Sequence, residues 1–221
     1  MSRKICFRYK GSVISRENLD KLILKYQPLK IETLIDTGKS RFFVIKNFTP
    51  DYFDNFSKLT LEHEPPIVVR GTKCNQRRNI GFFSNESEGY RYSGQIMKSQ
   101  PLDDKTLIDL LVKVNKTLDT TFNGILVNEY VDGTKTVGKH SDSEAGLDKK
   151  KMSVAGIAYG ATRIFRIRDI KSGKIVLDYE HEPCSLIVMD GDFQKEFAHE
   201  IPTQKKVKES RISLTFRNHF K

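Results

Sequence analysis

Apolar and polar residues alternate with two different periods along this chain, and the period changes near residue 124. Before it, three segments carry apolar residues three or four positions apart, which predicts amphipathic helices. These residues are Leu19, Leu22, Ile23 and Tyr26 in the first segment, Phe53, Phe56 and Leu59 in the second, and Leu107, Leu110, Leu111, Val114 and Leu118 in the third. Ser15, Thr49-Pro50 and Asp103 precede the three segments and are typical of helix starts.

After residue 124, short segments of strand character are separated by turn residues such as Asp132-Gly133, Ser172-Gly173 and Asp190-Gly191. The predicted strands are 125–130, 153–158, 163–168, 174–179, 185–189 and 211–217, with one more at 41–45 among the helices. Helices followed by many short strands predict an α+β fold, a barrel or sandwich braced by helices. Without repeats or linker-like tracts, we expect one domain over residues 39–221 and an N-terminal extension over residues 1–38.

The chain carries 38 Lys and Arg against 28 Asp and Glu, a formal charge of +10 that favours a polyanionic partner. Residues 69–94 mix basic and aromatic side chains between glycines, a pattern suited to phosphates and unpaired bases. The residues concerned are Arg70, Lys73, Arg77, Arg78 and Arg91 with Phe82, Phe83, Tyr90 and Tyr92. The structural alternative is a hairpin whose aromatic side chains are core.

Three widely spaced cysteines, Cys6, Cys74 and Cys184, form no CxxC pair, which favours a reduced intracellular protein without disulfides. No apolar run is long enough for a signal peptide or a membrane span. We therefore expect a soluble intracellular monomer with no membrane partner. The cluster 149–151 of three lysines does not distinguish nucleus from cytoplasm.

His140 and Asp142 are two residues apart, so in an extended strand both side chains point to the same side. His199 is the best candidate for a third ligand. Two histidines and one carboxylate on one face suit non-haem Fe(II), because three positions stay open for a cosubstrate and oxygen. The pattern therefore predicts an iron oxygenase.

An oxygenase cosubstrate with two carboxylates needs a cation at its far end, and arginine holds a carboxylate with two parallel hydrogen bonds. Alternation in segment 211–217 puts Arg211, Ser213, Thr215 and Arg217 on one side and Ile212, Leu214 and Phe216 on the other. The arginines face water if the apolar side is core, and a cavity if the apolar side packs outward on a helix. In segment 125–130, Asn128 and Tyr130 likewise share a face.

Taken together, the order of these residues resembles the AlkB family of Fe(II)/2-oxoglutarate dioxygenases. The matching pattern is Asn128-x-Tyr130, His140-x-Asp142, His199 and Arg211-x-x-x-Thr215-x-Arg217. Glu144 and the stretch Tyr90-Arg91-Tyr92-Ser93-Gly94 are similar to substrate-facing parts of members that act on double-stranded DNA. The resemblance covers about residues 41–221, although Ser213 stands where many members have Asn and residues 74–87 match poorly.

The resemblance implies a double-stranded β-helix (jelly-roll) core with a nucleotide-recognition lid at about residues 69–94. It implies catalytic roles for His140, Asp142, His199 and Arg211, the first three as ligands of Fe(II). By the same match, Tyr130 and Arg211 hold the distal carboxylate of 2-oxoglutarate, and Asn128, Ser213 and Arg217 are its other contacts. The residues implied to bind substrate are Tyr90, Tyr92, Ser93, Glu144, Arg77 and Arg78.

The implied activity is oxidative demethylation of 1-methyladenine or 3-methylcytosine in DNA or RNA. Formaldehyde is released, and 2-oxoglutarate and O2 yield succinate and CO2. One alternative is a 2-oxoglutarate-dependent protein hydroxylase with the same core, which leaves the basic and aromatic lid unexplained. The other is a non-catalytic nucleic-acid-binding protein, in which His140-x-Asp142 is coincidental.

Overall fold

The computed structural model describes residues 8–9, 12–13, 29–69, 71–92, 95–142, 147 and 153–219. The chain divides into two compact units, residues 1–30 and 31–221. In the first unit, the described residues are the paired strands β1 (Arg8–Tyr9) and β2 (Ser12–Val13) and the segment 29–30. The helix predicted around Leu19 lies outside the described residues.

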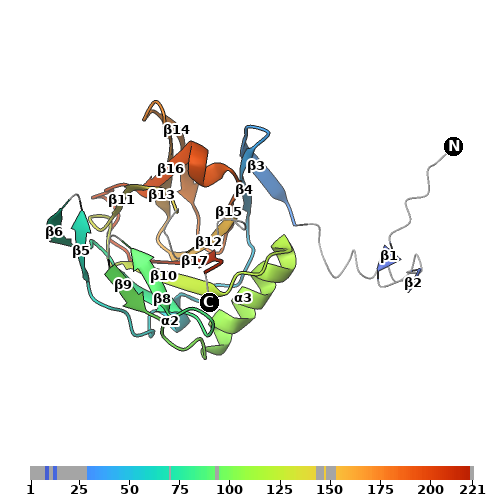
Figure 1. Ribbon diagram of the computed structural model, residues 1–221, viewed down its shortest axis with the longest axis horizontal. Helices are drawn as coiled ribbons and strands as arrows, with labels where there is room; N and C mark the ends of the chain where they lie inside the picture. The colour runs from blue at the N-terminus through green and yellow to red at the C-terminus, as the bar shows by residue number, and fades with distance from the viewer. Residues whose placement is uncertain are drawn as a thin grey trace. The chain divides into compact units, whose positions relative to one another are not determined.

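The second unit is built on two antiparallel sheets, the arrangement expected of a jelly-roll core (Figure 1). The larger contains, in spatial order, β3 (Ile31–Asp36), β4 (Ser40–Ile45), β15 (Leu186–Gly191), β12 (Val154–Gly160), β17 (Arg211–Arg217), β10 (Gly124–Tyr130) and β7 (Asn79–Phe83). The smaller contains β11 (Val137–His140), β16 (Phe197–Ile201), β13 (Arg163–Asp169) and β14 (Ile175–His181). Phe42, Ile187, Phe165 and Phe197 join both sheets in one buried cluster, so the sheets pack face to face. The predicted fold class is confirmed.

The six strands predicted after residue 124 form within two residues of their expected ends. Several of the described strands were not predicted, and two of them matter for the site and the large sheet. One is β16, which carries His199, and the other is β3, which pairs with β4. The large sheet therefore includes residues 31–36, which we had expected in the N-terminal extension.

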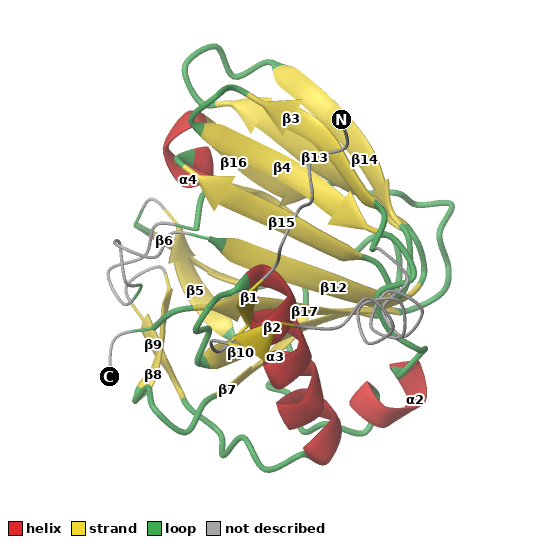
Figure 2. Cartoon of the chain, turned by 90° about the vertical axis from the view of Figure 1, so that its right-hand side faces the viewer, coloured by secondary structure: helices red, strands yellow, loops and turns green. Residues whose placement is uncertain are grey.

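The longest helix among the described residues, α3 (Lys105–Leu118), covers the outer face of the large sheet (Figure 2). Asp104 caps it by accepting a hydrogen bond from the Leu107 amide at 2.9 Å. Its buried Leu107, Leu110 and Val114 share one cluster with the apolar residues of β10 and β17. The second predicted helix is the short α2 (Phe53–Phe56), and α4 (Phe193–Glu196) lies between β15 and β16.

This packing decides which way β17 faces. Ile212, Leu214 and Phe216 are buried on the α3 side, so Arg211 and Arg217 point to the other side, between the two sheets. Because β10 lies beside β17 in antiparallel register, Tyr130 is opposite Arg211 and Asn128 is opposite Ser213. The polar residues of both strands thus face one interior space.

Segment 69–94 divides into three parts. Two small hairpins, β5 (Pro66–Val69) with β6 (Thr72–Asn75) and β8 (Gly89–Tyr92) with β9 (Gln95–Lys98), flank β7 in sequence. Strand β7 itself pairs with β10 as an edge of the large sheet, and its Phe82 and Phe83 are buried. These two aromatic side chains therefore belong to the core, as the structural alternative to base contact had it. Among the described residues, no helix is long and apolar enough to cross a membrane.

Candidate metal and cosubstrate site

His140, Asp142 and His199 come together at the end of the small sheet. Strands β11 and β16 pair His140 directly with His199, and their ring centroids are 4.4 Å apart. Oδ1 of Asp142 lies 3.5 Å from Nε2 of His140 and 3.9 Å from Nε2 of His199. One potential ligand atom from each residue lies within 4.8 Å of the others. The fold thus brings together the three predicted ligands.

The unused polar atoms of this cluster fit a divalent cation. Nδ1 of His140 lies 2.8 Å from the Gly138 carbonyl oxygen, which can only accept, so Nδ1 carries the proton and Nε2 keeps its lone pair. Oδ2 of Asp142 and Nδ1 of His199 are buried without a hydrogen-bond partner among the described residues. Burial, and then the electrostatic effect of the neighbouring His140, lower the pKa of His199 to about 3, so its ring is neutral and able to bind metal. The donor set of two imidazoles and one carboxylate suits Fe(II).

Asp142 is held from two further directions. Its carboxylate accepts a hydrogen bond from Nη2 of Arg217 at 2.7 Å, and its backbone amide donates to Oε1 of Gln194 on α4 at 2.8 Å. Burial alone would raise the pKa of Asp142, but Arg217 and then His199 outweigh it and hold the pKa well below its usual range. Asp142 is therefore ionised, as a metal ligand must be. Gln194 was not predicted, because no motif marks it.

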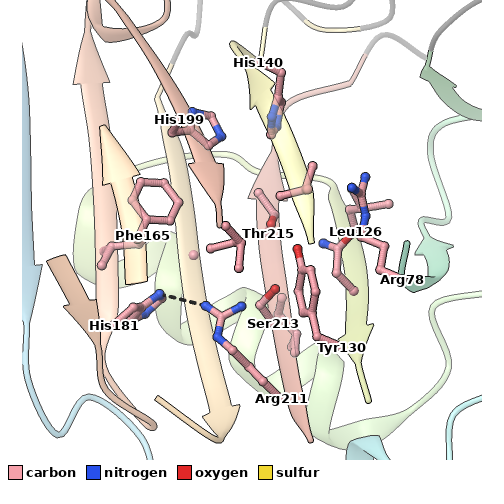
Figure 3. A pocket seen from close by; sticks show the side chains of 16 residues that line it. Arg78, Leu126, Tyr130, His140, Phe165, His181, His199, Arg211, Ser213 and Thr215 are labelled. Carbon is pink, nitrogen blue, oxygen red and sulfur yellow. Dashed lines mark hydrogen bonds between the residues drawn. The ribbon is translucent and has the colours of Figure 1, made fainter. Parts of the chain in front are cut away.

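A cavity extends from the two histidines into the space between the sheets (Figure 3). It is lined by His140 and His199 at one end and by Arg211, His181 and Tyr130 deeper in, with Asn128 and Ser213 also on its wall. The guanidinium carbon of Arg211 lies 5.6 Å from the centre of the Tyr130 ring. Four of the predicted cosubstrate residues therefore line the same cavity as both histidines.

Arg217 differs from these four. It was expected near the cosubstrate, but its observed partner is the triad carboxylate of Asp142. The guanidinium carbon also lies 5.3 Å from the centre of the Tyr90 ring. Arg217 thus connects the metal cluster to the hairpin β8–β9, and its contact with 2-oxoglutarate stays a prediction.

The residues predicted to bind substrate are only partly described. Arg78 is buried and lines the cavity, whereas Arg77 is exposed and donates to the Thr134 carbonyl oxygen at 2.7 Å. Tyr90 is 2% exposed and packs on Phe82. A ring this buried contributes to packing, so stacking on a base stays a prediction. Glu144, Ser93, the Tyr92 side chain and lysines 149–151 lie outside the described residues.

His181 lines the cavity although the sequence analysis did not select it. Its Nδ1 lies 3.1 Å from Nη2 of Arg211, and its Nε2 lies 3.1 Å from the Ser185 carbonyl oxygen. The signal was weak but present, because Leu177, Tyr179 and His181 alternate along β14 and share its inner face.

Residues 47–217 match the family model described as the 2OG-Fe(II) oxygenase superfamily. The alpha-ketoglutarate-dependent dioxygenase alkB homolog 3 of Rattus norvegicus is 31% identical over 140 residues, covering 58% of this chain and 46% of the relative. The DNA oxidative demethylase ALKBH2 of Arabidopsis thaliana is 28% identical over 218 residues, covering 83% and 68%.

ALKBH2 of Homo sapiens, also named a DNA oxidative demethylase, is 30% identical over 137 residues, covering 58% of this chain and 51% of the relative. The chain thus spans about half the length of these mammalian relatives. Among solved structures, OsALKBH1 superposes with a TM-score of 0.56 at 15% identity, covering 86% of this chain and 100% of the other. At that identity, the likeness concerns the fold alone.

Proposed function

Because the chain belongs to the 2OG-Fe(II) oxygenase superfamily, we propose that it is an oxidative demethylase of alkylated nucleic acid. It removes methyl groups from lesions such as 1-methyladenine and 3-methylcytosine in DNA or RNA and releases them as formaldehyde. The observation that carries the proposal is one cavity with the His140 and His199 rings near one end and the buried Arg211 at the other. The similarity to proteins named DNA oxidative demethylase supports the choice of substrate class.

His140, Asp142 and His199 are the residues that would hold Fe(II). When bound, the iron supplies the oxygen activation that side chains cannot perform, with 2-oxoglutarate as the co-reductant that leaves as succinate and CO2. The protein contributes a neutral His199 and an ionised Asp142, both buried between the sheets. These two residues therefore need no change of protonation before the metal binds.

Arg211 would bind the distal carboxylate of 2-oxoglutarate. The side chain is 1% exposed, and its Nε has no hydrogen-bond partner among the described residues. A buried guanidinium with unused donors is costly unless an anion pairs with it. The Tyr130 hydroxyl can donate to the same carboxylate, while Asn128 and Ser213, paired across β10 and β17, offer further hydrogen bonds along the cavity.

The nucleic acid would approach from the side of the β5–β6 and β8–β9 hairpins. Arg78 immediately precedes β7 and reaches the cavity. The neighbouring Arg77 is exposed and therefore able to contact a phosphate. Attack on a base requires that the base leave the stack, for which Tyr90, Tyr92, Ser93 and Glu144 are the proposed contacts. The net charge of +10 strengthens such binding without selecting a sequence.

The decisive test is product release after anaerobic reconstitution with Fe(II). Oligonucleotides carrying 1-methyladenine, as DNA and RNA and single- and double-stranded, are incubated with 2-oxoglutarate and oxygen. We expect formaldehyde that requires 2-oxoglutarate and disappears in Asp142→Ala but not in Asp178→Ala, a carboxylate bound to Arg166 on the small sheet. Succinate without formaldehyde on every oligonucleotide would instead favour the protein hydroxylase. If neither succinate nor formaldehyde is formed, the proposed oxygenase activity is contradicted.

A further inference from the structure

Two buried arginines approach the ring of Tyr130, and their hydrogen bonds differ. Their guanidinium carbons lie 5.9 Å (Arg163) and 5.6 Å (Arg211) from the ring centre, and each side chain is 1% exposed. Arg163 donates to the carbonyl oxygens of Asp132, Lys135 and Pro202 at 3.0, 3.0 and 2.7 Å and to Oε1 of Gln204 at 3.1 Å. The donors of Arg163 are thus occupied by the protein itself, and its role is to hold these segments together.

Arg211 has a very different environment. In the described part of the chain, its Nη2 forms a side-chain hydrogen bond with Nδ1 of His181, and its Nε is buried without a partner. Figure 3 shows the His181 ring and the Arg211 guanidinium meeting at the deep end of the cavity. Of the two arginines beside Tyr130, Arg211 is therefore the one positioned to bind a ligand.

The two contacts of His181 determine its tautomer. The Ser185 carbonyl oxygen can only accept a hydrogen bond, so Nε2, 3.1 Å away, carries the proton. Nδ1 then has a lone pair and accepts from Arg211, which can only donate. Burial first, and then the charge of Arg211, lower the pKa of His181 to about 3. The imidazole is therefore neutral and leaves the charge of Arg211 uncompensated.

We propose that His181 is a positioning residue for the cosubstrate, a neutral acceptor that fixes Arg211 toward the cavity while leaving its positive charge to the distal carboxylate. The inference rests on the cosubstrate role proposed above for Arg211. A carboxylate at position 181 would hold the guanidinium equally well but would neutralise it and compete with the ligand. An aliphatic residue would leave Nη2 unpaired and the guanidinium free to turn.

The surroundings of His181 support an orienting role. The rings of Tyr179 and Phe165 lie 6.1 and 6.4 Å from the imidazole, and the residue opposite it on β13 is Arg163, whose donors are already occupied. The imidazole is 1% exposed, so its rotamer is set by packing. No acidic side chain among these neighbours offers Arg211 a competing partner.

The test uses three variants and two ligands. His181→Leu removes the acceptor, His181→Asn keeps an acceptor near the position of Nδ1, and His181→Asp adds a negative charge. Binding of 2-oxoglutarate and of 2-oxovalerate, which has the same chain length without the distal carboxylate, is measured by anaerobic calorimetry on the Mn(II)-loaded protein. The thermal midpoint of each variant reports whether it is folded.

We expect His181→Leu and His181→Asp to weaken 2-oxoglutarate binding roughly tenfold or more, the usual effect of losing a residue that orients a ligand-binding group. Binding of 2-oxovalerate should stay unchanged. The affinity of His181→Asn for 2-oxoglutarate should be within about threefold of the parent's, because Asn keeps an acceptor for Arg211. In turnover, the KM for 2-oxoglutarate should rise while kcat at saturation stays the same.

Three results would overturn the inference. One is His181→Leu binding 2-oxoglutarate like the parent, and another is an equal loss for both ligands, which would indicate a merely structural residue. Undiminished affinity in His181→Asp would contradict the need for a neutral acceptor. If the unmodified protein itself fails to prefer 2-oxoglutarate over 2-oxovalerate, the cosubstrate role of Arg211 fails instead, so the two failures are distinguishable.

Discussion

Arg217 donates from Nη2 to Oδ1 of Asp142 across 2.7 Å, and neither side chain is exposed by more than 4%. The pair joins β17 of the large sheet to the metal cluster at the end of the small sheet. A buried ion pair of this kind contributes less through its attraction than it costs when one partner is removed, because the remaining charge is then buried alone. Asp142 is consequently the residue most sensitive to changes at position 217.

In the metal-free protein, we expect Arg217→Met to lower the free energy of unfolding by about 3–5 kcal/mol. Added Mn(II) should then raise the melting temperature of Arg217→Met more than that of the parent, because the cation supplies the positive charge that Asp142 has lost. Urea unfolding and thermal melts with and without metal measure both effects. Arg166→Met, which breaks a partly exposed pair with Asp178, is the control and should cost less than about 1 kcal/mol. Equal losses in the two variants would contradict the prediction.

Metal binding itself should be visible as stabilisation. A ligand that binds only the folded state adds about 2.7 kcal/mol at a concentration a hundred times its Kd, so Fe(II) or Mn(II) should raise the melting temperature and a chelator should reverse the rise. His140→Ala should abolish this response, since it removes one of three ligands. His63→Ala, an exposed histidine outside the cluster, should keep it. A full response in His140→Ala would exclude the proposed metal site.

Substitutions of Arg211 and Arg163 should have different effects, the first on cosubstrate binding and the second on stability. Arg163→Met leaves several buried carbonyl oxygens without a donor, each costing about 1–3 kcal/mol, so it should unfold far more easily than the parent. Arg211→Met removes a buried charge that lacks an anionic partner, so its melting temperature should not fall. Calorimetry should show that Arg211→Met loses 2-oxoglutarate affinity. If Arg211→Met binds 2-oxoglutarate normally, our assignment of the cosubstrate site is wrong.

Strand 211–217 illustrates how far the sequence alone could lead. Alternation separated Arg211 and Arg217 from Ile212 and Leu214, but both orientations of the strand satisfied the pattern equally. Only the packing of α3 on the apolar side turns the arginines inward. The two-residue spacing likewise predicted that His140 and Asp142 lie together, which they do, although β11 ends at His140 and Asp142 lies in the bend that follows rather than in the strand.

Contacts between distant strands could not be predicted in this way. His181 meets Arg211 because β14 and β17 belong to different sheets that face each other, and no local pattern specifies that pairing. The same holds for Gln194, whose side chain binds the Asp142 amide from a short helix 52 residues away in sequence. Phe82 was placed in a lid by its aromatic and basic neighbours, but its strand completes the edge of the large sheet.

The entrance to the cavity offers a test of substrate binding. Arg78 lines the cavity, whereas Arg77 is exposed and donates a hydrogen bond to the Thr134 carbonyl oxygen. We expect Arg78→Ala to lower turnover of a methylated oligonucleotide at saturation. Arg77→Ala should mainly weaken binding and reduce the salt dependence of affinity by about one unit of slope, the share of one phosphate contact. Titrations at several salt concentrations distinguish the two, and identical behaviour of both variants would contradict these separate roles.

His219 provides a prediction of pH dependence. Burial, and then the charge of Arg217, lower its pKa to about 3, and its ring packs 4.6 Å from that of Phe82. In the unfolded chain a histidine titrates near about 6.5, so between these values the unfolded state binds more protons than the folded state. Stability contributed in this way is fully present above pH 6.5 and falls as the pH drops toward 3.

Replacing this residue should therefore flatten the acid side of the stability curve. In His219→Phe, which keeps an aromatic ring against Phe82, the loss of unfolding free energy from pH 6 to pH 4 should be smaller by about 1.4 kcal/mol per pH unit, the share of one proton. Urea unfolding at several pH values with a chelator present measures it. Above pH 7 the difference between variant and parent should be constant, because no such proton is taken up there. Parallel curves down to pH 4 would mean that His219 is protonated in the folded protein.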